Sequence, residues 1–275
     1  MGVILSILAS IMPLVIVSIA ALYSEYAGRM VFFIDGLVTV SAFICYAVAV
    51  KTGVFAFGIL LCVILPALFV FAICLIVEKF NLNSFIASLS ENIFLLSIVT
   101  CFSVLIFKTR GVLVSESFGF DQSAFRVVSI LSGIFVCAPS ILFLRKSRHG
   151  LYLRITGSDE SVLENAGVNP AKYRIASWVI ASVLSSVVGV LLLLRLSSFV
   201  PYISGGIGWI ALAIVFLGNK KDWRVILMAA VFGLIQYAAN NIQNVEMFKN
   251  IPSAVLLSLP HLICVLMIVI VPKRK

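Results

Sequence analysis

The apolar residues of this 275-residue chain form long runs separated by short polar stretches. A helix needs roughly 20 apolar residues to cross the hydrocarbon core of a bilayer, so runs of this length predict membrane spans. Nine runs can be outlined, at roughly residues 3–22, 30–50, 53–77, 84–107, 124–145, 173–195, 203–219, 223–243 and 252–272. The pattern predicts an all-α polytopic transmembrane helix bundle of about nine spans, within a range of eight to ten, forming a single transmembrane domain over residues 1–275.

The boundary between the sixth and seventh predicted spans is the least regular part of this pattern. The stretch RLSSFVPYISGGIG, from Arg195 to Gly208, contains a proline, three glycines and several serines. These residues interrupt helices, so a half-helix near the membrane surface is an alternative here. Such a half-helix would change the number of spans.

The longest polar interruption runs from residue 145 to residue 174, and it must lie in water. Ser161 and Glu164 have the spacing of a capping box, Gly167 suits a left-handed helix stop, and Pro170 prevents continuation. These signals predict a short helix, which by itself is only marginally stable in water. We therefore expect it to dock on a soluble cytoplasmic partner, through an apolar side formed by Val162, Leu163 and Ala166.

The sequence GSDESVLENAGVNPAKYR, residues 157–174, resembles the cytoplasmic coupling loop of ABC-importer permeases in the branched-chain amino acid, ribose and nucleoside class. The nucleoside branch is the most similar, although Val162 and Leu163 stand where that branch usually has alanine. The resemblance implies that an ABC ATPase docks on this loop. The residues predicted to couple to it are Gly157, Ser161, Leu163, Glu164, Gly167, Asn169, Tyr173 and Arg174.

A second stretch, SEYAGRMVFFIDGLVTVSAF at residues 24–43, also resembles the nucleoside-type permeases, and it includes Asp35 and Gly36. A carboxylate inside a membrane span costs about 2.5 kcal/mol or more, which makes Asp35 a candidate functional residue. It either lines the substrate pathway or caps a half-helix at a break made by Gly36. The residues leave both roles open.

Three further polar or glycine-rich sites fall within predicted spans. Glu91 and Asn92 either line the pathway or form hydrogen bonds between helices. The segment Ser204–Gly218 resembles a glycine-containing segment of the same permeases, and its glycines permit close helix approach or a helix break. Gln236, Asn240 and Gln243 recur at helical spacing, with Asn244 beside them, and they form either a solvated helix end or a polar wall of the pathway. The last two sites supply Gly206, Gly208, Gln236 and Asn240 as pathway candidates.

Composition places the chain in the membrane class, with 62% hydrophobic and 11% charged residues. The net charge of +9 arises from lysines and arginines in short loops, which is typical of membrane orientation rather than of nucleic-acid binding. With the 145–174 loop inside, the distribution predicts the N-terminus outside and the C-terminus in the cytoplasm of a bacterial cell (inner) membrane. We expect contact with membrane lipid and none with nucleic acid.

Catalytic chemistry is not indicated. The six cysteines lie in apolar runs without a CxxC pair, and the two histidines are far apart, so we expect neither a metal site nor a cofactor nor catalytic residues. No P-loop pattern occurs, so a separate subunit would hydrolyse ATP.

The resemblance implies three partners: the ABC ATPase on the cytoplasmic side, a second identical or similar permease subunit, and an extracytoplasmic substrate-binding protein. The sequence thus predicts a permease subunit that forms the path for a small neutral polar or aromatic solute. A nucleoside is the favoured solute, with riboflavin or a simple sugar as other possibilities. The alternatives are a branched-chain amino acid permease and an ion-coupled secondary transporter, although the latter usually carries an internal repeat and its own coupling charges.

Overall fold

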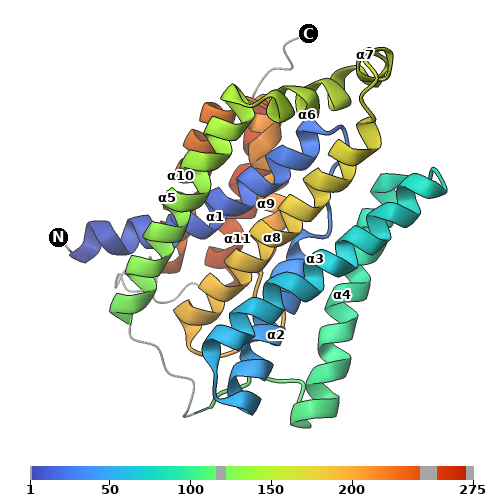
Figure 1. Cartoon of the computed structure of the whole chain (residues 1–275). Coiled ribbons are helices and arrows are strands. Elements are labelled where there is room, and N and C mark those ends of the chain that lie inside the picture. Colours follow the sequence, from blue (N-terminus) through green and yellow to red (C-terminus); the bar gives the residue numbers. More distant parts are fainter. Residues whose placement is uncertain (1, 116–121, 242–252, 271–275) are drawn as a thin grey trace.

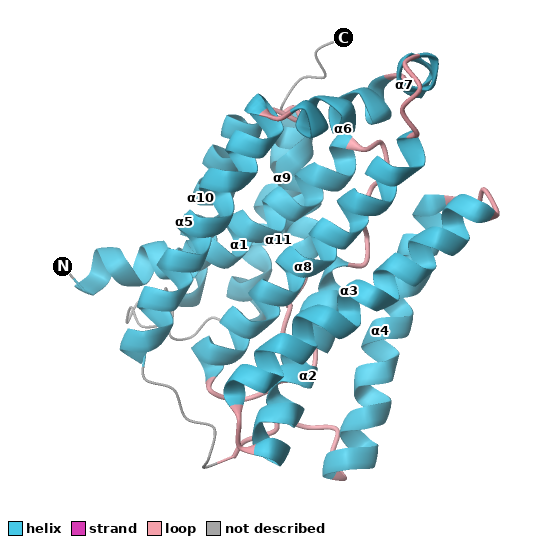
Figure 2. Ribbon diagram, in the orientation of Figure 1, coloured by secondary structure: helices cyan, strands magenta, loops and turns pink. Residues whose placement is uncertain are grey.

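The computed structural model describes residues 2–115, 122–241 and 253–270. Within these ranges the chain forms eleven helices and no β-strand (Figures 1 and 2). The helices are α1 (Gly2–Tyr26), α2 (Ile34–Thr52), α3 (Phe55–Lys79), α4 (Ser84–Phe107), α5 (Gln122–Lys146), α6 (Arg148–Ser158), α7 (Glu160–Asn165), α8 (Pro170–Leu196), α9 (Ile207–Leu217), α10 (Asp222–Asn241) and α11 (Ser253–Ile270).

The predicted class, an all-α polytopic bundle, is confirmed. Seven helices in the described ranges are long and apolar enough to cross a membrane: α1, α2, α3, α4, α5, α8 and α10. The ninth predicted span contains α11. The seventh, 203–219, is wrong as a full span because it contains only the 11 residues of α9. At 1.5 Å per residue α9 is about 16 Å long, roughly half the thickness of the hydrocarbon core.

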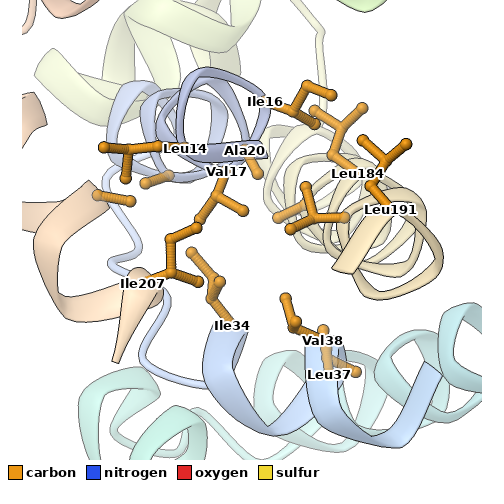
Figure 3. Packing of buried hydrophobic residues seen from close by; sticks show 14 of the residues in the cluster. Leu14, Ile16, Val17, Ala20, Ile34, Leu37, Val38, Leu184, Leu191 and Ile207 are labelled. Carbon is orange, nitrogen blue, oxygen red and sulfur yellow. The ribbon is translucent and has the colours of Figure 1, made fainter. Parts of the chain in front are cut away.

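The interior of the bundle is formed mainly by α1, α2 and α8, which bury most of their residues. Helix α1 packs against α5, α8, α9 and α10, while α2 packs against α3, α4 and α8. Figure 3 shows how aliphatic side chains of α1 and α8 meet the first residues of α2 and α9, including Ile34 and Ile207. These helices are apolar on nearly every side because protein surrounds them.

The outer helices α3, α4 and α5 keep most of their apolar side chains exposed. Figure 1 shows α4 at the edge of the bundle, and it packs mainly on α2. In water such apolar surfaces would be unfavourable, whereas in a bilayer they face hydrocarbon or another protein subunit.

The polar segment between α5 and α8 contains more helix than the sequence indicated. Only one short helix was predicted in residues 145–174, but α6 precedes α7 there (Figure 1). Ser147 caps α6, because its hydroxyl accepts a hydrogen bond from the His149 N–H at 3.1 Å. Sequence periodicity missed α6 because it packs against α1, α5 and α8 without a strongly apolar face.

Candidate transport pathway and coupling surface

The N-terminal ends of α2 and α9 meet inside the bundle. Asp35, in the first turn of α2, is 1% exposed, and its Oδ1 accepts a hydrogen bond from the Gly208 N–H at 3.0 Å. This carboxylate therefore caps α9, where the positive end of the helix dipole favours a negative charge. Capping of a half-helix was one of the two predicted roles, but the break lies at Gly205 and Gly206, not at Gly36.

Gly206 and Gly208 make this junction possible by different means. Gly206 has φ +80°, a left-handed conformation that other residues adopt at a cost, and α9 starts immediately after it. Gly208 lies so close to Asp35 that a Cβ there would be 3.0 Å from Oδ2. The two glycines thus permit the turn and the close approach, as the sequence predicted in general terms.

Gly36 joins the same junction to α4. Its N–H donates a hydrogen bond to Asn92 Oδ1 at 2.7 Å, and a Cβ at Gly36 would lie 2.9 Å from Leu95 Cβ. For Asn92 the structure therefore contains the hydrogen bond between helices that was one of its two predicted roles. A part in the substrate pathway stays a prediction for Asp35, Gly36 and Asn92.

Glu91 lies apart from this junction although it neighbours Asn92 in sequence. Its side chain is 4% exposed, and neither carboxyl oxygen has a hydrogen-bond partner. It borders an apolar gap of about 370 Å³ between α3 and α4, where Phe69 stacks on Phe94. The structure thus separates Glu91 from the other predicted pathway residues.

A polar cavity of about 540 Å³ lies beside the start of α9, between α1, α8, α10 and α11. It contains two predicted pathway residues, Gln236 and Asn240, which therefore lie on the same wall. Sequence analysis did not assign its other polar residues to the pathway: Ser10, Arg195, Ser204 and His261. Its volume lies within the range of small-molecule sites, about 300–1,000 Å³.

Two of these additional cavity residues, Ser204 and His261, connect the cavity with the α2–α9 junction. The Ser204 side chain is 5% exposed, and its hydroxyl lies beside Asp35 without reaching the distance and angle of a hydrogen bond. The His261 ring packs against Gly206, where a Cβ would come within 2.9 Å of its Nε2. Nothing local in the sequence indicated that Ser204 and His261 lie at the same cavity.

Arg195 lies in the last turn of α8, where it lines this cavity and is largely covered. The sequence pattern did not indicate this position. Among the described residues Arg195 forms no ion pair. The only available sign was its position after four leucines at the end of an apolar run.

In the polar segment of residues 145–174, the helix signals predicted the end of α7 correctly and its start wrongly. Helix α7 begins after Asp159, whose Oδ1 accepts hydrogen bonds from the Ser161 N–H at 3.1 Å and from the Ser161 hydroxyl at 2.6 Å. The cap is therefore Asp159, not Ser161. Gly167 has φ +74° after the helix, as predicted, and Asn169 caps α8 by accepting from the Ala171 N–H at 2.9 Å.

The predicted apolar docking side needs a correction. Leu163 is 1% exposed because it faces its own chain, so it is not available to a partner. Val162, at 50% exposure, points outward, and Glu164 and Ala166 are also exposed. The six residues of α7 thus divide between an anchor, Leu163, and a free surface around Val162.

A network of ion pairs fixes α7 to the membrane helices. Arg174, at the start of α8, pairs with Glu160 of α7 and with Glu78 of α3, where the Nη2 to Oε2 distance is 2.6 Å. Glu78 also pairs with Arg29, in the α1–α2 connection, at 3.0 Å. The predicted coupling residue Arg174 therefore bridges the short helix and two other parts of the bundle.

The remaining predicted coupling residues, Tyr173 and Gly157, support the same end of the molecule. The Tyr173 hydroxyl lies 3.1 Å from His149 Nδ1, and its ring packs edge-on against Tyr152. Gly157 lies against the backbone of Tyr26 and Gly28, where a Cβ would clash. Both contacts hold α6 and α8 in place, while a direct contact with an ATPase stays a prediction.

These features define a multi-pass membrane protein with a half-helix, a polar internal cavity and a short helix outside the membrane spans. A model of the permease component of branched-chain amino acid transport systems matches residues 3–270. The chain belongs to this family and is an ABC transporter permease.

Individual relatives agree with this family. The chain is similar to the nucleoside ABC transporter permease protein NupC of Lactococcus lactis subsp. cremoris, with 24% identity over 93% of this chain and 87% of that protein. A putative glucose ABC transporter permease protein, TsgC13 of Haloferax volcanii, is 32% identical over 34% of this chain and 29% of that protein. Among solved structures, PsaBC from Streptococcus pneumoniae in complex with Fab has a similar fold, with TM-score 0.54 and 16% identity over 96% of this chain and 91% of that chain.

Proposed function

We propose that this permease carries a small neutral polar or aromatic solute, most plausibly a nucleoside, across a bacterial cell (inner) membrane. The observation that carries the proposal is the cavity beside α9, because its amide, hydroxyl and imidazole groups suit hydroxyls and heterocyclic edges. Similarity to a protein named as a nucleoside permease supports the same solute class. Riboflavin or a simple sugar would use similar contacts.

The energy for transport would come from a separate ABC ATPase that docks on the exposed surface of α7. A six-residue helix with an outward valine, an inward leucine and ion pairs to α8 can transmit a displacement to the bundle. A second identical or similar permease subunit would cover part of the exposed apolar surface of the outer helices. An extracytoplasmic binding protein would deliver the solute, with the N-terminus outside and the C-terminus in the cytoplasm.

Reconstitution into liposomes with the ATPase and the binding protein tests this function. We expect uptake of labelled nucleoside that requires ATP and disappears when the P-loop lysine of the ATPase is changed to alanine. Competition with riboflavin, glucose and leucine then ranks the solute classes. Uptake of leucine without nucleoside uptake would support the branched-chain amino acid alternative, and uptake driven by an ion gradient without the ATPase would support a secondary transporter.

A further inference from the structure

The polar cavity contains one cation, the guanidinium of Arg195, for which the described residues provide no anion. Arg195 has no ion pair among the described residues, and Asp35, the nearest acidic group to the start of α9, already accepts the Gly208 N–H. A largely covered guanidinium without an ion pair is costly, so a molecule that enters would be favoured if it presents acceptors to that group.

The other polar groups of the cavity are neutral. They comprise the Gln236 and Asn240 amides, the Ser10 and Ser204 hydroxyls and the His261 ring. The Ser204 hydroxyl is fully buried and lies beside Asp35 rather than open to the cavity. A phosphate or another strong anion would be expected to draw several cations, whereas one arginine among amides and hydroxyls suits a neutral molecule with many hydrogen-bonding groups.

The geometry of the arginine side chain indicates which hydrogen-bonding groups the bound molecule should present. Its guanidinium presents parallel N–H groups in a rigid fork, which fits two neighbouring acceptors better than one. Among nucleobases, guanine presents such a pair, O6 and N7, while adenine presents the N7 acceptor beside the N6 donor. Adenine is instead matched by the amide of Asn or Gln.

Resting on the proposed nucleoside transport, we propose that Arg195 is a specificity-determining residue that binds the O6/N7 edge of a guanine-type base. The amides of Gln236 and Asn240 then hydrogen-bond the ribose hydroxyls or the remaining edge of the base. The permease would therefore prefer guanosine and inosine, which share this edge, over adenosine.

Ligand competition tests the proposal without altering the protein. In liposomes containing the permease, its ATPase and its binding protein, we expect guanosine to be transported with a KM roughly tenfold below that of adenosine, since a paired arginine contact discriminates by about this factor. The affinity of the binding protein for each nucleoside is measured separately by calorimetry, so that its contribution to the KM ratio can be removed. Inosine should behave like guanosine, and 7-deazaguanosine, which lacks the N7 acceptor, should behave like adenosine.

Substitution of Arg195 provides a second test of the proposal. Arg195→Gln should reverse the ratio of guanosine to adenosine uptake, because an amide matches the N6/N7 edge of adenine. Arg195→Lys should bring this ratio close to one. The ratio compares two nucleosides in the same liposomes, so it does not depend on how much variant protein is inserted. Lys51→Gln, which removes an exposed cation outside the cavity, is the matched control and should leave the ratio unchanged.

The outcomes separate the two proposals. If the transporter takes up no nucleoside, this inference fails, and the proposed function fails as well if riboflavin and glucose are not taken up either. If nucleosides are transported but Arg195→Gln leaves the base ratio unchanged, the function stands and the assignment of Arg195 is overturned. Stronger competition by guanosine monophosphate or by leucine than by guanosine would show that Arg195 binds an anion, which also overturns the proposal.

Discussion

In the part of the chain that the structure describes, charged side chains are paired at the α7 end of the permease and left unpaired in its polar cavity. At the α7 end, Glu78 pairs with Arg29 and Arg174, and Arg174 pairs in turn with Glu160. In the cavity, Arg195 faces open volume without an ion pair among the described residues. Charges that are paired within a chain hold its elements together, while a covered charge that is left unpaired has its partner elsewhere.

The α2–α9 junction lies between these extremes. Asp35 is buried like Glu78, but it accepts backbone hydrogen bonds instead of pairing with a cation. It therefore stabilises the start of a helix next to the cavity. The comparison predicts that stability depends most on the paired network, less on the junction and least on the free surface of α7.

The largest loss of stability is expected for Glu78→Gln. This variant keeps the shape of the side chain but leaves Arg29, and in part Arg174, without an anion in a largely covered position. Removal of one partner from a buried pair costs about 3 kcal/mol or more. Thermal unfolding in detergent measures it, with Glu164→Gln, an exposed carboxylate, as the control; equal melting temperatures for the two variants would show that the network contributes little.

Asp35→Leu should have the next largest effect. It removes the acceptor of the Gly208 N–H, and a buried donor without a partner costs about 1–3 kcal/mol. Asp35→Asn retains an acceptor oxygen and a residue that caps helices well, so it should fold nearly normally. The yield of monodisperse protein distinguishes the two variants; if Asp35→Leu matches wild type in yield and uptake, the capping contact is dispensable.

Gly167→Ala is expected to cost about 1 kcal/mol, because alanine is strained at φ +74° although no atom lies within 4 Å of the added Cβ. Gly53→Ala is a matched comparison, since Gly53 has φ +72° and equally open surroundings at the end of α2. Both variants should lose similar stability in thermal unfolding. Only Gly167→Ala should weaken copurification of the ATPase. If both variants retain the ATPase equally, the left-handed residue after α7 is not needed for docking.

Val162→Asp should leave stability unchanged, since Val162 is half exposed, but it should release the ATPase by placing a charge in the docking surface. Leu163→Asp is the contrasting variant, because it puts the charge inside the chain and should unfold the segment. Copurification of the ATPase in detergent, with ATP-dependent uptake, separates the two effects. If Val162→Asp keeps both the ATPase and full uptake, this side of α7 does not contact the ATPase.

Several features of the fold could be predicted from the sequence because they depend on neighbouring residues. The long apolar runs located the membrane helices, and the glycines of RLSSFVPYISGGIG marked the half-helix as an alternative. The positive φ at Gly167 was predicted from the following polar stretch. The class of transporter could also be predicted, since the coupling loop resembles that of its family over a continuous segment.

Other features depended on contacts between distant residues. The direction of Leu163 could not be deduced, because a two-turn helix offers two apolar neighbours and only packing decides which one is buried. The role of Arg195 could not be deduced for a similar reason: its position relative to a cavity is set by α1, α10 and α11 rather than by its neighbours in sequence.

The sequence by itself determined that this chain spans a membrane many times and where its apolar helices lie, because hydrophobicity is a local property summed over about 20 residues. It also determined that a buried carboxylate at position 35 needs a partner, since an uncompensated charge in a span is expensive. Only the tertiary structure decided that the partner is the backbone of Gly208, 173 residues further along the chain. The physical reason is that hydrogen bonds and ion pairs act over a few ångströms, and only the folded chain brings such distant groups within that range.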